Sequence, residues 1–151
     1  MNVGEICVRD VVTVREAAEL SEAAELMREN HIGYLVVVEP KLAPSCLIPV
    51  GVLTDRDIVV SVVAKNTDVR SLRVGDVMTR QPVIVAEGAS IDQALHEMRR
   101  IGVRRIPVVD RNGMLVGVLS LDDILSALSA ELADLSGSVR HELRVEKALR
   151  P

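Results

Sequence analysis

The chain contains an internal repeat, and this feature constrains its fold more than any other. Compared with itself at an offset of 71 residues, the sequence aligns 3–38 with 74–109 and gives 12 identities in 36 positions. Average composition would give roughly two or three identities over that length. Further along, GVLTDRDI at 51–58 matches GVLSLDDI at 117–124 at an offset of 66, so the first copy has 5 extra residues within 39–49. The chain is therefore predicted to be two copies of one supersecondary unit.

Each copy shows the same order of local patterns. A short β-branched run, at Val11–Val14 and again at Val83–Val85, predicts a strand. Apolar residues spaced i, i+3, i+4, i+7 from Leu20 and from Ile91 then predict a helix with one apolar face. Two further strands and a last helix complete the unit. The second copy joins these strands by a tight Asn-Gly turn, whereas the first is expected to use a Pro-containing loop within 39–49.

Composition argues against several functional classes. The net charge of −4 and the 1% aromatic content do not suit a nucleic-acid binder, so no nucleic-acid partner is predicted. The two cysteines and three scattered histidines lack the spacing of a zinc site or a disulfide framework, so no metal is predicted. No apolar run approaches the ~18 residues that span a bilayer, and the start of the chain lacks the features of a signal peptide. We therefore expect a cytoplasmic protein without a membrane partner.

Several phrases of the sequence together resemble the CBS domain family, named for cystathionine β-synthase. They are VGDVMTRQPVIV, GVRRIPVVD and GVLSLDDI in the second copy and GVLTDRDI in the first. The resemblance covers about residues 3–132 and implies an α+β fold of two tandem βαββα repeats, packed about a pseudo-two-fold axis with their short sheets facing each other. The expected division is a first CBS repeat at 3–64, a linker at 65–73, a second repeat at 74–132 and a C-terminal helical tail at 133–151. Ser136-Gly137 is expected to end the helix before the tail.

Two polar pairs, Thr54 with Asp57 and Ser120 with Asp123, are the most informative residues. Each pair opens a helix directly after a Gly-Val-Leu strand end. One interpretation is structural: the hydroxyl caps the helix, and the carboxylate favours the positive end of the helix dipole. The other is functional, because unpaired N–H groups at a helix start attract phosphate. The resemblance implies that Thr54 and Ser120 donate to phosphate, while Asp57 and Asp123 accept from ribose hydroxyls.

The resemblance also implies that the opposite repeat completes each cleft. In one cleft Thr54 and Asp57 would meet Val83, Ile84, Arg104 and Arg105; in the other, Ser120 and Asp123 would meet Val12, Thr13, Gly33 and Tyr34. Two arginines would neutralise phosphate, so the first cleft is expected to bind phosphorylated ligands more tightly. The alternative interpretation is that Arg104 and Arg105 are a solvated surface pair.

The leading hypothesis is a non-catalytic regulatory module. It would bind an adenosine nucleotide (AMP, ADP or ATP) in the clefts between the repeats and signal to an unidentified partner protein. No required cofactor and no catalytic residues are predicted, because no residue set supplies a nucleophile, a base and an oxyanion site together. A homodimer is expected, with contacts on the last helix of each repeat at Ile58, Val59, Val62, Val63, Ile124, Leu125 and Leu128. The alternative is a ligand-independent dimerisation or scaffold module whose Thr/Ser–Asp pairs are only helix caps.

Overall fold

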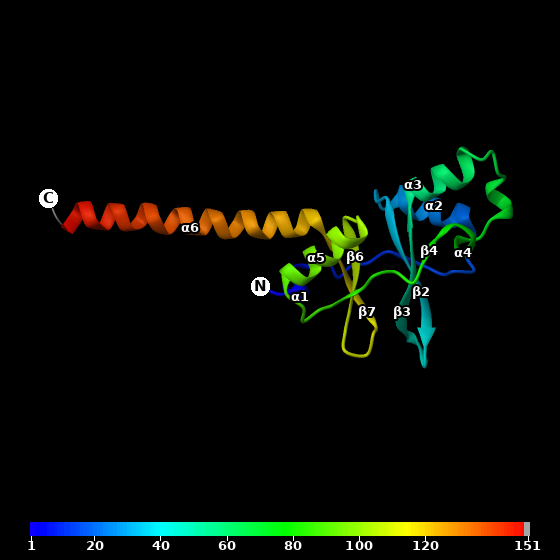
Figure 1. Cartoon of the computed structure of the whole chain (residues 1–151), viewed down its shortest axis with the longest axis horizontal. Coiled ribbons are helices and arrows are strands. Elements are labelled where there is room, and N and C mark those ends of the chain that lie inside the picture. The colour runs from blue at the N-terminus through cyan, green and yellow to red at the C-terminus, as the bar shows by residue number, and fades with distance from the viewer. Residues whose placement is uncertain (150–151) are drawn as a thin grey trace.

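The computed structural model describes residues 1–149 and contains two small sheets with helices packed on them, followed by one long C-terminal helix (Figure 1). The first sheet has the order β1-β2-β3-β4 and the second the order β5-β6-β7. The strands are β1 (Thr13–Val14), β2 (Tyr34–Lys41), β3 (Ala43–Thr54), β4 (Thr79–Arg80), β5 (Val85–Ala86), β6 (Arg105–Val109) and β7 (Leu115–Ser120). In each sheet the first strand pairs in parallel with the second, which forms an antiparallel hairpin with the third. The predicted α+β fold of two repeated units is confirmed.

The helices follow the apolar spacing of the sequence. The elements are α1 (Val3–Ile6), α2 (Leu20–Glu29), α3 (Asp55–Ile58), the π-helical turn η1 (Val59–Val63), the 3-10 turn η2 (Val69–Ser71), α4 (Val74–Val77), α5 (Ile91–Ile101) and α6 (Leu121–Leu149). The two amphipathic helices bury equivalent residues, which are Leu20, Ala23 and Met27 in α2 and Ile91, Ala94 and Met98 in α5. The predicted helical spacing is therefore confirmed in both copies.

Three local expectations were wrong. The first strands are shorter than predicted and lie at Thr13–Val14 and Val85–Ala86, because only these residues pair with the neighbouring strand. The segment 39–49 is not a loop but extends the β2–β3 hairpin, with the fully exposed Leu42 at its tip. Helix α6 does not end at Ser136-Gly137. One glycine costs about 1 kcal/mol in a helix interior, which is too little to stop a segment rich in Leu and Ala.

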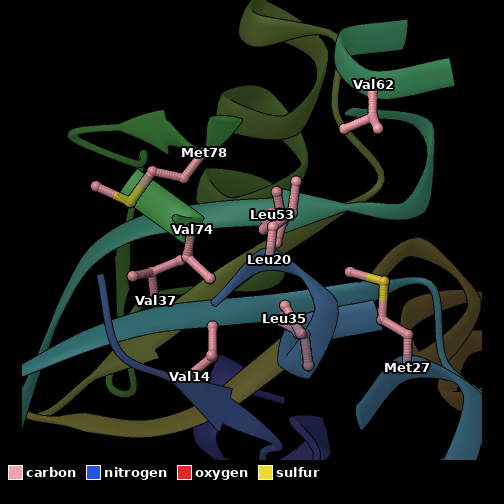
Figure 2. Packing of buried hydrophobic residues seen from close by; sticks show 10 residues of the cluster. Val14, Leu20, Met27, Leu35, Val37, Leu53, Val62, Val74 and Met78 are labelled. Atoms are coloured by element: carbon pink, nitrogen blue, oxygen red, sulfur yellow. The ribbon is translucent and has the colours of Figure 1, made fainter. Parts of the chain in front are cut away.

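Each repeat completes its core with the first residues of the other repeat. The first core contains residues of β1, α2, β2 and β3 together with Val74 and Met78 from the start of the second copy (Figure 2). The second core contains residues of β5, α5, β6 and β7 together with Val3 from α1. Both Val3 and Val74 are fully buried. Backbone hydrogen bonds join the repeats in the same reciprocal way. The N–H of Gly4 donates to the Glu87 carbonyl, and the N–H of Gly75 donates to the Glu16 carbonyl.

The cores also bear on the dimer contacts expected from the sequence. Ile124 is 1% exposed and belongs to the second core, and Val62 belongs to the first. Ile58 packs against the first core, so the dimer contacts expected at these three positions were wrong.

The exchanged segments also extend the sheets. Val8 and Val118 form an isolated antiparallel bridge, with both N–H···O distances at 2.9 Å. In the other half β4 pairs with β3, joining Thr79 to Val52. The segment that follows α1 is thus fixed against β7, beside the start of α6. Among the described residues, no helix has both the length and the apolar character needed to cross a lipid bilayer.

Candidate nucleotide site

Both Thr/Ser–Asp pairs form reciprocal helix caps. The Thr54 hydroxyl oxygen accepts from the Asp57 N–H at 3.1 Å, and the Asp57 carboxylate accepts from the Thr54 N–H at 2.9 Å. The same bonds join Ser120 and Asp123, at 3.1 and 2.8 Å, and the Ser120 hydroxyl also donates to the Asp123 carboxylate. The structural interpretation is therefore confirmed at both positions. A carboxylate has about four lone-pair sites, so these bonds leave it able to accept from a ligand.

A cavity of about 280 Å³ lies between the repeats at the N-terminus of α6. We call it the Ser120 cleft. The second repeat contributes Val118, Ser120 and Asp123 to its wall, and Arg105 points to the same space. The first repeat and its leading segment contribute Val8, Asp10, Val11, Val12, His31, Ile32, Gly33 and Tyr34. Of the residues assigned to this cleft from the sequence, all but Thr13 line it.

A second cavity, of about 250 Å³, lies on the other side of Tyr34. We call it the Val83 cleft. Its walls are Tyr34, Val52, Thr79, Gln81, Pro82, Val83, Ile101, Val103, Arg105, Ile106 and Pro107. Thr54 lies two residues beyond Val52 on β3, on the same face of the strand, yet neither Thr54 nor Asp57 reaches the wall of this cavity. The Val83 cleft is therefore mostly apolar.

Each cleft was assigned two residues that are neighbours in the chain, and in both cases their side chains point to opposite sides. Val12 and Val83 occupy equivalent positions and line their respective cavities. Thr13 and Ile84 follow them and point away, because successive side chains in extended backbone leave opposite faces. Ile84 lies instead in a shallow depression against the outer side of α5, next to Asp92 and Gln93. Of the residues that the sequence assigned to the clefts in these two segments, Val12 and Val83 line the cavities and Thr13 and Ile84 do not.

Tyr34 and Arg105 form a wall shared by the two cavities. They are equivalent in the hairpins, since Tyr34 pairs with Thr54 across β2–β3 and Arg105 with Ser120 across β6–β7. Burial raises the pKa of the Tyr34 phenol, while the positive charge of Arg105 opposes this increase. The phenolic oxygen is buried and has no hydrogen-bond partner among the described residues. It is a polar atom that a ligand in either cavity could satisfy.

The two adjacent arginines have different surroundings. The Arg104 guanidinium lies on the surface, 3.3 Å from the Asp122 carboxylate, and its side chain is 72% exposed. The solvated interpretation therefore holds for Arg104. Arg105 instead lines the Ser120 cleft as well as the Val83 cleft. Arg105 is therefore not confined to the cleft of Thr54 and Asp57, where the sequence placed both arginines, and the structural ground for expecting that cleft to be the tighter one is lost.

Sequence reasoning missed Asp10 and His31, which both line the Ser120 cleft. His31 was set aside because it has no second ligand at metal spacing. Its backbone φ is 54°, and the equivalent Gly102 has a φ of 71°, so each ends its helix in the left-handed conformation. In the alignment of the two copies His31 matches a glycine that ends a helix, and it lies two residues before Gly33. This alignment is the signal that could have placed His31 at the cleft. No group of three or more His, Cys, Asp or Glu side chains in the described part of the chain could hold a metal ion.

Comparisons with known proteins agree with this architecture. The family model described as CBS domain matches residues 3–64 and 74–130. A protein of Methanopyrus kandleri, MK0525, is 35% identical over 125 residues, which are 83% of this chain and 61% of that protein. The chain thus spans less than two thirds of that relative's length.

Two solved structures share the fold. The CBS domain protein PAE2072 from Pyrobaculum aerophilum, complexed with AMP, has a TM-score of 0.74 and 31% identity over 89% of this chain and 99% of that one. CBSX2 in complex with AMP has a TM-score of 0.69 and 26% identity over 86% of this chain and 98% of that one. Both of these similar proteins bind AMP.

Proposed function

Because the chain belongs to the CBS domain family, we propose that it is a non-catalytic regulatory module that binds an adenosine nucleotide of the AMP, ADP or ATP class. The bound nucleotide changes the module's affinity for a regulated partner protein. The observation that carries the proposal is the Ser120 cleft, where both repeats bring a hydroxyl, a carboxylate, a guanidinium and apolar walls to one cavity at a helix N-terminus. The AMP complexes of two structural neighbours support the ligand class.

Each part of the nucleotide has a matching group in the Ser120 cleft. Asp123 accepts from the ribose hydroxyls, and its bonds to Ser120 hold it in position. Arg105 and the N-terminus of α6 supply positive charge for phosphate, and the Ser120 hydroxyl donates to phosphate only if its hydrogen turns away from Asp123. Val12 and Val118 provide apolar surface for the adenine, and the unpaired Tyr34 phenol provides a polar contact. No aromatic stacking is required, which suits a chain with one tyrosine and no Phe or Trp.

The Val83 cleft is the second candidate site. Val83 and the shared Arg105 line it, and Thr54 and Asp57 are proposed to contact a ligand that extends beyond its wall, whereas Ile84 and Arg104 lie outside it. Its mostly apolar lining favours a less charged part of a ligand, so the Ser120 cleft is the tighter site for phosphorylated nucleotides. The sequence predicted the opposite order of affinity for the two clefts. The order changes because Arg105 lines both clefts and Arg104 forms an ion pair with Asp122.

The alternative function is a ligand-independent dimerisation or scaffold module. It is favoured by one observation: all four cap residues are already engaged with each other. A thermal-shift panel separates the two functions. A nucleotide at 100 times its dissociation constant should add about 2.7 kcal/mol of apparent stability, whereas a scaffold would respond to no member of the panel.

Calorimetric titration of AMP, ADP and ATP tests the site itself. Asp123→Ala removes the ribose acceptor and should weaken binding by about 1.5–3 kcal/mol, roughly tenfold to a hundredfold. Asp122→Ala is the matched control, because it removes a neighbouring carboxylate that is 64% exposed and pairs with Arg104 outside the cleft. Wild-type affinity in Asp123→Ala and also in Asp57→Ala would show that the ribose assignment is wrong.

A further inference from the structure

The Ser120 cleft and the Val83 cleft meet at one wall, which is formed by Tyr34 and Arg105. Both side chains line both cavities. The positive charge of Arg105 also reaches the phenol of Tyr34: burial raises the pKa of that phenol, and the guanidinium opposes the increase. A ligand in one cleft therefore contacts the same two side chains as a ligand in the other, and the two candidate sites are not independent.

Positive charge is scarce in both clefts. Within the described residues, Arg105 is the only Lys or Arg in either wall, and the Val83 cleft has no other charged residue. The Ser120 cleft also contains His31 and two carboxylates, Asp10 and Asp123, so it has no surplus of positive charge. A phosphate monoester carries a charge of about −1.5 to −2 at neutral pH. One guanidinium does not neutralise even one such group, and two phosphates beside it would repel each other.

Hydrogen-bonding capacity at the shared wall is also limited. The Tyr34 phenol has one hydrogen to donate, and its buried oxygen has no hydrogen-bond partner among the described residues. Once a ligand in one cleft has accepted that hydrogen, a ligand in the other cleft can only donate to the phenol. An oxygen-rich phosphate cannot do so when it is fully ionised, whereas the hydroxyl and amino groups of a nucleoside can.

The hairpin register assigns Arg105 to a phosphate in the Ser120 cleft. Arg105 lies opposite Ser120 across β6–β7. Residues directly opposite each other in an antiparallel pair have Cβ atoms about 4.5–5.5 Å apart on one face of the sheet. Ser120 also caps the start of α6, where the helix dipole attracts an anion. The start of α3 offers no equivalent in the Val83 cleft, because neither Thr54 nor Asp57 lines that cavity.

We propose that the two clefts compete for Arg105, so that the chain binds one phosphorylated nucleotide, in the Ser120 cleft, while the Val83 cleft takes an uncharged nucleoside such as adenosine. This inference rests on the proposed function and adds the regulation of its site. A phosphorylated ligand in the Ser120 cleft weakens binding of a second one but leaves room for a neutral ligand. The module then responds to a pair of ligands of different charge.

Calorimetric titration of the full chain at low ionic strength, where repulsion is least screened, tests the competition. AMP should occupy one tight site per chain. A second AMP should bind more weakly by roughly tenfold or more, the order of the repulsion between two unit charges about 10 Å apart at an effective dielectric constant of about 20. Adenosine titrated into the AMP-saturated chain should still fill one further site. Two AMP sites of equal affinity, or no site left for adenosine, would overturn the proposal.

A charge added to the Val83 cleft tests the cause. Gln81 is exposed and lines this cleft alone, so Gln81→Lys gives the cleft a cation of its own. The variant should bind the second AMP at least as many times more tightly as the wild type loses by competition. Ala130→Lys is the matched control, because it adds the same charge at an exposed position of α6 that lines neither cleft. Wild-type behaviour of Gln81→Lys, or an equal gain in Ala130→Lys, would contradict the shared arginine. If AMP binds to none of these proteins, the proposed function itself is wrong, which is a separate result.

Discussion

Gly117→Ala should destabilise the fold by forcing apart the two segments that close the Ser120 cleft. Gly117 lies on β7, where the segment after α1 crosses it. A Cβ at this position would lie 2.8 Å from the Cys7 sulfur and 2.9 Å from the Val8 carbonyl oxygen. The Val8 carbonyl accepts from the Val118 N–H, so the crossing segment cannot move away without breaking that bond.

The expected cost follows from which atoms the new methyl group meets. Forcing a methyl group into a packed site costs about 1–3 kcal/mol, and a backbone oxygen gives way less readily than the end of a side chain. At the equivalent Gly51 a Cβ would meet the sulfur of the flexible Met78 side chain at 2.6 Å and the Thr79 carbonyl oxygen at 3.0 Å. Gly51→Ala should therefore be destabilising for the same reason as Gly117→Ala. A Cβ at Gly88 would meet no atom of the described residues within 4 Å, so Gly88→Ala should be neutral within about 0.5 kcal/mol.

Urea unfolding of the three variants measures these differences. Gly117→Ala and Gly51→Ala should both lower the free energy of unfolding relative to Gly88→Ala, with the denaturant slope unchanged. Adding Cys7→Ala to Gly117→Ala should recover only part of the loss, since the Val8 carbonyl remains. If Gly117→Ala is as stable as Gly88→Ala, the crossing segment is not held against β7 as described.

Three further predictions test the caps, the buried phenol and the core. Thr54→Ala and Ser120→Ala should each lower the free energy of unfolding by about 0.5–2 kcal/mol in urea, and a loss near zero would contradict the caps. Tyr34 is the only tyrosine, so an ultraviolet titration reports on it alone, and phenolate should form well above pH 10, the ordinary value. Because burial favours the neutral phenol in the folded state, this contribution to stability is complete below pH 10 and is lost as the pH rises further; phenolate at pH 10 in the folded chain would contradict it. Leu119→Ala should cost about 2–5 kcal/mol by calorimetry or urea, whereas Leu42→Ala, fully exposed at the hairpin tip, should change stability by less than about 0.5 kcal/mol.

The features predictable from sequence are those set by local periodicity. The burial of Leu20, Ala23 and Met27 follows from helical spacing, and the duplicated pattern predicts the same for the second copy. The exchange of Val3 and Val74 between cores has no local signal, because each is an ordinary valine in a short helix and its partners lie more than ten residues away. Arg104 and Arg105 differ for a similar reason. Neighbours in extended backbone face opposite sides, so a motif places the pair but does not say which arginine faces the cleft.

The position of α6 connects the Ser120 cleft with an exposed surface. Its first turn, capped by Ser120 and Asp123, is part of the cleft wall, and its exposed leucines begin at Leu125, one turn further on. A nucleotide that engages Ser120 and Asp123 therefore acts on the helix that carries these leucines. Linkage makes such an effect reciprocal: if bound nucleotide changes the affinity for a protein that contacts α6 by some factor, that protein changes the affinity for nucleotide by the same factor. A helix that belongs to both the cleft and the exposed surface thus provides a direct physical route by which a small ligand alters what a partner protein recognises.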